Sequence, residues 1–147
     1  MKTLVTGHRL FKLQNYDTDW IRLAIAETLV DPDKPTSYAY AGMASGVDLW
    51  FCQACLDLGI PYEACIPFED QRLEMAEDER LLRDRLIGRA AKVSHVRNRH
   101  MVERAQAGIV VWDGNKGGTH NVVQQMVEAR KPFWWLNPVA TTIWRCF

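Results

Sequence analysis

The sequence predicts an α/β fold: a three-layer sandwich in which a mainly parallel sheet of about six strands carries helices on both faces. Two observations predict it. Short apolar runs of strand length alternate along the chain with amphipathic stretches of helical period. The 147 residues show no repeat, linker or low-complexity segment, and this length suits a single domain, residues 1–147, with one sizeable core.

The first two strands are predicted on either side of one amphipathic helix. TLVT, residues 3–6, is the first apolar run. Residues 18–30 have apolar side chains at helical spacing, and Asp17 or Thr18 is the expected N-cap. DPDKP ends this helix, and SYAYA, residues 37–41, is the second strand.

The middle of the chain repeats this alternation. Residues 46–59 predict a helix that ends at Gly59, and YEACI, residues 62–66, predicts a strand stopped by Pro67. Residues 70–91 are highly charged and helical in pattern. Because both signs are mixed along this segment, we interpret it as a solvated face.

The last third contains the most continuous strand. KVSHV, residues 92–96, predicts the fourth strand, and a short helix over 99–105 follows it. AGIVVW, residues 107–112, is the fifth strand, and residues 118–130 form the next predicted helix. PFWWLN, residues 132–137, is the sixth strand.

Charge and hydropathy argue against two classes of protein. Lys+Arg and Asp+Glu number 18 each, so the formal net charge is zero and nothing draws the whole chain to a nucleic-acid backbone. No apolar run approaches the length of a membrane span, and the start MKTLVTG is too short for a signal peptide. We therefore expect a cytoplasmic protein with no membrane partner.

Two of the four cysteines, Cys52 and Cys55, form a C-x-x-C pair that is typical of redox or metal sites. They lie inside a predicted helix, and no second C-x-x-C or H-x-x-x-H follows. Buried free thiols are the favoured interpretation, and no metal site is predicted.

Glycines and polar residues follow the predicted strands. In a parallel sheet the carboxyl ends of the strands share one edge, where ligands bind at the point of strand-order reversal. We therefore predict one composite ligand site there, made of Gly7, His8, Arg9, Gly42, Met43, Ser45, Gly46, Asp48, Arg97, Asn98, Met101, Asp113, Gly114, Lys116, Gly117, Gly118 and Thr119.

The chemistry of these segments favours a phosphate. Glycines that precede a helix let the backbone approach an anion, and the helix start presents unpaired N–H groups. GMASG and GNKGGT both have this placement, with hydroxyls at Ser45 and Thr119 and positive charge at Arg9, Arg97 or Lys116. Neither matches the Walker or dinucleotide glycine motifs. The alternative for either loop is a tight turn with no ligand, with Asp48 and Asp113 as helix-start and turn residues.

The segments GMASGVDLW, NRHMVERAQAGIVVWDG and GGTHNVVQQMVEARKP resemble the SLOG superfamily, Rossmann-like proteins that join DprA (Smf) to the Lonely Guy enzymes. The YpsA-like branch is the most similar. The resemblance extends from Gly7 to about Pro138 and implies a pocket for nucleotides or their derivatives. Arg97 and Met101 keep the spacing of an arginine and a methionine in the Lonely Guy enzymes.

The resemblance also indicates where enzyme chemistry is in doubt. Lonely Guy enzymes cleave the N-glycosidic bond of nucleoside monophosphates with the signature P-G-G-x-G-T-x-x-E. Gly117, Gly118 and Thr119 fit its phosphate-holding part, but Val122 stands at the position of the catalytic glutamate. Asp48 or Asp113 is the candidate replacement, since glycoside cleavage needs a carboxylate.

Three functions remain open on these grounds. The favoured one is a sensor or regulator that binds a nucleotide-type ligand without turnover and needs no cofactor. The second is a nucleotide N-glycosidase or phosphoribohydrolase. The third, DprA-like binding of single-stranded DNA, is disfavoured by the charge balance. A homodimer is a further expectation from the resemblance and the C-terminal tryptophans.

Overall fold

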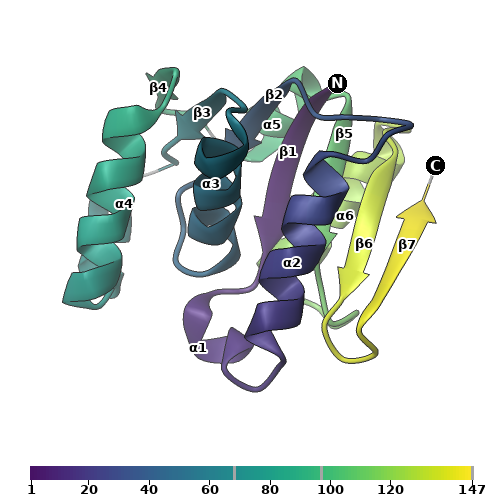
Figure 1. Ribbon diagram of the computed structural model, residues 1–147, viewed down its shortest axis with the longest axis horizontal. Coiled ribbons are helices and arrows are strands. Elements are labelled where there is room, and N and C mark those ends of the chain that lie inside the picture. Colours follow the sequence, from purple (N-terminus) through teal and green to yellow (C-terminus); the bar gives the residue numbers. More distant parts are fainter. Residues whose placement is uncertain (68, 97, 147) are drawn as a thin grey trace.

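The computed structural model describes residues 1–67, 69–96 and 98–146. Over these ranges the strands form one sheet in the order β4-β3-β2-β1-β5-β6-β7, in which the first six are parallel and β7 is antiparallel to β6 (Figure 1). Their bounds are β1 Lys2–Gly7, β2 Tyr38–Ala41, β3 Tyr62–Cys65, β4 Lys92–Ser94, β5 Ala107–Val111, β6 Phe133–Asn137 and β7 Thr142–Cys146.

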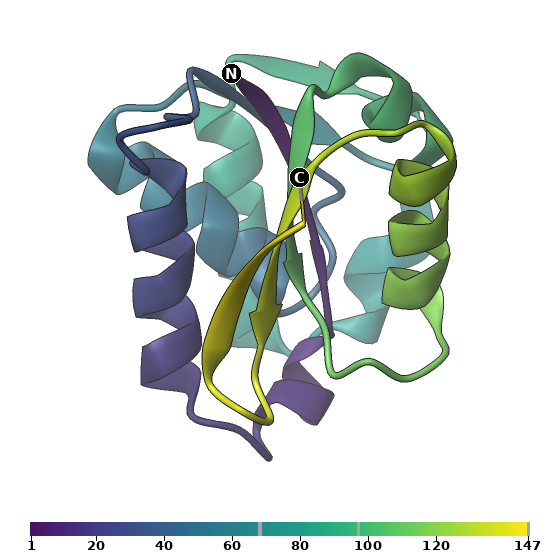
Figure 2. The ribbon, with the colours of Figure 1, turned by 90° about the vertical axis from the view of Figure 1, so that its right-hand side faces the viewer.

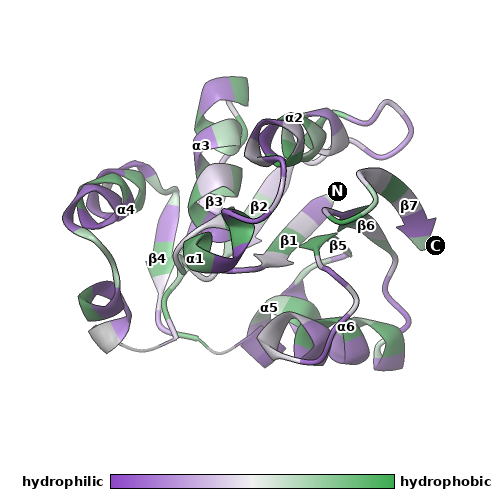
Figure 3. Ribbon diagram, turned by 90° about the horizontal axis from the view of Figure 1, so that it is seen from below, coloured by the Kyte–Doolittle hydropathy of each residue, from purple (hydrophilic) through white to green (hydrophobic). Residues whose placement is uncertain are grey.

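Helices cover both faces of the sheet, which gives the three predicted layers (Figure 2). They are α1 Leu10–Leu13, α2 Thr18–Leu29, α3 Val47–Leu58, α4 Glu77–Arg89, α5 Asn98–Arg104 and α6 Gly118–Glu128, with a 3-10 helix η1 at Glu69–Glu74. Seen along the strands, α2, α3 and α4 lie on one face and α5 and α6 on the other (Figure 3). The larger core lies under the first group and the smaller under the second.

The helix ends follow from the residues placed there. The Asp17 carboxylate accepts a 3.1 Å hydrogen bond from the Trp20 N–H, as the predicted N-cap requires. Gly59 ends α3 in the left-handed conformation, with φ at 72°, where a residue without a Cβ is favoured.

Trp134 is buried in the core beneath α2 while Trp135 faces the α6 side, the alternation expected of a strand.

Several element predictions are corrected. The charged segment 70–91 is not one helix: η1 ends at Glu74, and α4 begins at Glu77 because Glu77, Asp78 and Glu79 favour a helix start there. It is also not wholly solvated, since Gln71 and Arg83 are buried and joined by a 3.0 Å hydrogen bond.

The sheet has one strand more than predicted. β7 follows a turn in which the Asn137 side chain accepts hydrogen bonds from the N–H groups of Val139 and Ala140. The fourth strand ends at Ser94 instead of residue 96, and the short helix α1 between the first strand and α2 was not predicted. Within the described ranges, every helix is too short or too polar to cross a bilayer.

Strand order reverses between β1 and β5. The chain leaves β1 toward α1 and α2 on one face, and leaves β5 toward α6 on the other (Figure 3). The loops after these adjacent strands therefore diverge and leave a crevice at the carboxyl edge of the sheet. This crevice contains the candidate site.

Candidate functional site

A pocket of about 430 Å³, here called the central pocket, opens at the β1–β5 crevice. Most of the predicted ligand residues line it: Gly7, His8, Arg9, Gly42, Asp48, Asn98, Met101, Lys116, Gly117, Gly118 and Thr119. They come from the loops after β1, β2 and β5 and from α5, so the topology gathers segments more than 100 residues apart in the chain, such as Gly7 and Gly118. The volume is within the range of small-molecule sites, about 300–1,000 Å³.

The remaining predicted residues lie elsewhere. Met43 is fully buried in the larger core, and Ser45 lines a neighbouring pocket instead. Gly46, Asp113 and Gly114 shape the adjoining loops without lining the central pocket. Arg97 lies outside the described residues.

The start of α6 forms one wall of the central pocket. Gly117 precedes the helix with φ at 153°, and no side chain caps the helix. Among the described residues, no group accepts a hydrogen bond from the N–H of Gly118 or of Thr119. A Cβ added at Gly118 would meet no atom within 4 Å, so the space above this helix start is open. Unpaired N–H groups at a helix start favour an anion.

The start of α3, the second predicted phosphate loop, is already occupied by the protein's own carboxylates. The Ser45 hydroxyl donates to Glu79 at 2.8 Å, and the Gly46 N–H donates to the same carboxylate at 3.2 Å. The Ala44 N–H donates to Asp48 Oδ2 at 3.0 Å. Gly46 is also required for packing, because a Cβ there would lie 2.7 Å from the His8 carbonyl oxygen. The two glycine loops are therefore not equivalent.

His8 and Asp113 join the loops on the two sides of the crevice. The Asp113 N–H donates a 3.0 Å hydrogen bond to His8 Nε2. An accepting Nε2 carries no proton, so its 3.3 Å approach to Asp113 Oδ1 is not an ion pair. Burial lowers the pKa of His8, which agrees with a neutral ring.

Asp113 is held as a buried anion. Burial alone would raise its pKa, but the Asn115 N–H at 3.0 Å and the Lys12 ammonium at 3.0 Å outweigh burial and lower the pKa to about 2. Trp112 closes the same loop by donating from Nε1 to the Asn115 carbonyl oxygen. A carboxylate bound in this way anchors the loop and is a poor proton donor at neutral pH.

Asp48 has the opposite electrostatics. It is 8% exposed and lines the central pocket, and burial raises its pKa to about 7, although the Ala44 N–H and the Arg9 charge oppose this. Within residues 1–67, 69–96 and 98–146 its second oxygen, Oδ1, has no hydrogen-bond partner. Asp48 can thus exchange a proton near neutral pH inside the pocket.

Sequence reasoning missed other residues of the pocket. Lys12 and Phe11 belong to the unpredicted helix α1, and Asn115 belongs to the loop before α6. Gln71, in the segment interpreted as solvated, donates from Nε2 to the Gly42 carbonyl oxygen at 2.8 Å and lines the pocket. The position of Lys12 just after GHR was an available signal, whereas no local signal placed Gln71 there.

Comparison with solved structures places this architecture among known proteins. The chain matches the structural-genomics target TM1055 (TM-score 0.56, 15% identity, 90% of this chain and 71% of that one). It matches DNA processing protein A (DprA) from Streptococcus pneumoniae (TM-score 0.62, 16% identity, 91% of this chain) and spans 49% of that protein. It also matches the molybdenum cofactor carrier protein MCP from Chlamydomonas reinhardtii (TM-score 0.60, 13% identity, 95% and 79% of the two chains).

These likenesses, at 13–16% identity, show the fold: the chain shares a Rossmann-like α/β architecture with these proteins, as the sequence predicted. No protein-family model matches the sequence, and no curated protein sequence is significantly similar to it. Assignment to the YpsA-like branch stays a prediction.

Proposed function

We propose that the protein binds a nucleotide or nucleotide-derived ligand whose phosphate lies at the start of α6, and that it acts as a sensor or regulator. The observation that carries this proposal is the contrast between two helix starts. At α3, Glu79 and Asp48 accept the hydrogen bonds that an anion would take. At α6, the corresponding N–H groups open into the central pocket with no such partner among the described residues.

Charge around the pocket supports an anionic ligand. Lys116 lines it next to Gly117, and Arg9 lines it from the loop after β1. Arg9 and Lys12 contribute less, since the Arg9 guanidinium already faces Glu74 at 2.9 Å and the Lys12 ammonium faces Asp113 at 3.0 Å. A phosphate at the α6 start would therefore meet the helix N–H groups and one or two cations, a combination typical of phosphate sites.

A thermal-shift panel of nucleotides tests the proposal, with ADP-ribose, NAD and nucleotide sugars included. A ligand at about 100 times its Kd stabilises the fold by about 2.7 kcal/mol. For a chain of this length the expected rise in Tm is about 9 °C. No rise with any phosphorylated member of the panel would contradict the proposal.

A second candidate, N-glycosidic cleavage of a nucleotide, is favoured by Asp48. Of the two candidate carboxylates, Asp113 is ionised and fully engaged, whereas Asp48 lines the pocket with a pKa of about 7. That pKa suits a general acid at the leaving base. Val122 cannot serve, because it has no ionisable group and is buried in the smaller core.

Product chromatography separates the two candidates. If the protein is a hydrolase, free base and ribose 5-phosphate appear on incubation with the ligand found in the panel. Asp48→Asn then abolishes turnover while the Tm rise on binding remains. If no product appears with a ligand that binds, the sensor function is retained and the hydrolase is rejected.

A further inference from the structure

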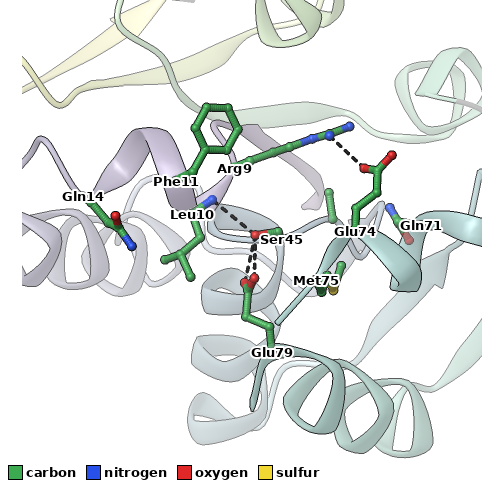
Figure 4. A pocket seen from close by; sticks show the side chains of 10 residues that line it. Arg9, Leu10, Phe11, Gln14, Ser45, Gln71, Glu74, Met75 and Glu79 are labelled. Atoms are coloured by element: carbon green, nitrogen blue, oxygen red, sulfur yellow. Dashed lines mark hydrogen bonds and ion pairs between the residues drawn. The ribbon is translucent and has the colours of Figure 1, made fainter. Parts of the chain in front are cut away.

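A second pocket, here called the side pocket, adjoins the central pocket. It has a volume of about 410 Å³ and lies between α1, the loop after β2, η1 and the start of α4 (Figure 4). The two pockets share Arg9, Phe11, Ala44 and Gln71. A ligand held at the start of α6 can therefore extend past Arg9 into the side pocket.

Part of the lining of the side pocket is apolar. Leu10, Phe11, Ala44 and Met75 line it, and the Phe11 side chain is 73% exposed although it is a large aromatic ring. An exposed ring at the mouth of a cavity offers a flat surface for stacking. This composition suits a planar heterocycle better than a second phosphate.

The polar rim of the side pocket is rich in acceptors. Glu74 and Glu79 approach from two sides: Glu74 faces Arg9 at 2.9 Å, and Glu79 holds Ser45 and Gly46 (Figure 4). Ionised carboxylates only accept hydrogen bonds, and each has about four lone-pair positions. Each carboxylate therefore has lone pairs that its present hydrogen bonds do not use. A ligand group with two N–H donors can donate to two of these lone pairs.

We propose that the side pocket receives the base of the bound nucleotide and selects bases that carry an exocyclic amino group over those that carry an oxo group in its place. The inference rests on the proposed function, because the phosphate at α6 brings the base within reach. An amino group offers N–H donors to Glu74 and Glu79. An oxo group places an acceptor against the same carboxylates, and the adjacent ring N–H of such a base offers one donor in place of the two N–H groups of the amino group, so at least one hydrogen bond to the carboxylates is lost.

Matched nucleotide pairs test the selection by isothermal titration. AMP and IMP differ in the 6-amino and 6-oxo groups, and CMP and UMP differ likewise at position 4. We expect the amino member of each pair to bind about tenfold tighter, the size of one hydrogen bond to a charged group. Ribose 5-phosphate, which has no base, should bind more weakly than AMP and CMP.

Glu74→Gln tests the recognition residue. Glu74 is chosen because, among the described residues, its carboxylate bonds the Arg9 side chain alone, whereas Glu79 holds the loop at Ser45 and Gly46. The variant should bring the AMP-to-IMP affinity ratio close to one without weakening ribose 5-phosphate. Glu77→Gln is the matched control: it removes the same charge nearby but lines neither pocket, so the ratio should stay near ten.

The outcomes separate this inference from the proposed function. Equal affinities within each pair, with binding that Gly118→Asp abolishes, would overturn base selection and leave phosphate binding in place. A ratio that Glu74→Gln does not change would remove Glu74 from recognition and overturn the inference as stated. Absence of binding by all four nucleotides and by ribose 5-phosphate would overturn the inference, and absence of binding by ADP-ribose, NAD and the nucleotide sugars as well would overturn the proposed function.

Discussion

The backbone N–H of Asp113 donates to Nε2 of His8 across the crevice between β1 and β5. The two residues are 105 positions apart in the chain; His8 is the first residue after β1 and Asp113 the second after β5. This bond joins the two loops whose divergence creates the central pocket. The shape of the pocket thus depends on a contact between its own walls.

Replacing His8 should loosen this contact. In His8→Ala the partly buried Asp113 N–H loses its acceptor, so we expect the free energy of unfolding to fall by about 1–2 kcal/mol. Chemical denaturation monitored by tryptophan fluorescence measures it. His100→Ala, on an exposed position of α5, is the control and should change stability by less than about 0.5 kcal/mol. Equal effects of the two substitutions would contradict the role given to His8.

Asp113 should make stability depend on acid pH. Its pKa is about 2 in the folded protein, against 3.8 for an aspartate without such partners in the unfolded chain, so the folded state favours the ionised form. The stabilisation is complete above about pH 4 and is lost as pH falls toward 2; its size is roughly 2 kcal/mol. The stability difference between wild type and Asp113→Asn should therefore shrink between pH 5 and pH 2.5, as thermal unfolding would show. A difference that is constant with pH would contradict the buried-anion assignment.

Asp48 should act in the opposite sense. Its folded pKa of about 7 lies above the ordinary value of 3.8, so the ionised form disfavours the folded state. Its unfavourable effect grows as pH rises from about 4 to 7. Asp48→Asn keeps an oxygen for the Ala44 N–H and removes the charge, so its Tm relative to wild type should increase over this interval. A Tm difference that stays level from pH 4 to 8 would contradict the raised pKa.

Most of the fold could be predicted from local patterns of apolar and turn residues. The six parallel strands were predictable because buried strands such as β5 are continuous apolar runs between turn residues. The break between η1 and α4 was not, because charged residues run through it and the buried Met75 between the two helices gives no periodic signal. The antiparallel strand β7 has a local signal in the sequence: the Asn-Pro turn is followed by β-branched and aromatic residues, which is typical of a turn before a strand.

The position of the site could be predicted from the sequence, but the roles of its individual residues could be predicted less well. Topology alone brings Gly7, Asp48 and Gly118 to one sheet edge. The unequal use of the two glycine loops depends on Glu79, which is 34 residues from Ser45 and comes from a helix whose direction the sequence does not reveal. The raised pKa of Asp48 likewise depends on its burial in the folded chain, and the lowered pKa of Asp113 depends on Lys12 from α1 as well as on the neighbouring Asn115 N–H.

Titration of Gly118→Asp with ribose 5-phosphate and AMP tests most directly whether a phosphate lies at the start of α6. Because a Cβ at Gly118 meets no atom within 4 Å, the added carboxylate should fill the anion position and leave the Tm of the free protein nearly unchanged. Gly88→Asp is the control, since it adds the same charge at an open glycine of α4 that lines neither pocket. We predict that wild type and Gly88→Asp bind and that Gly118→Asp does not. Unchanged binding by Gly118→Asp would contradict the account.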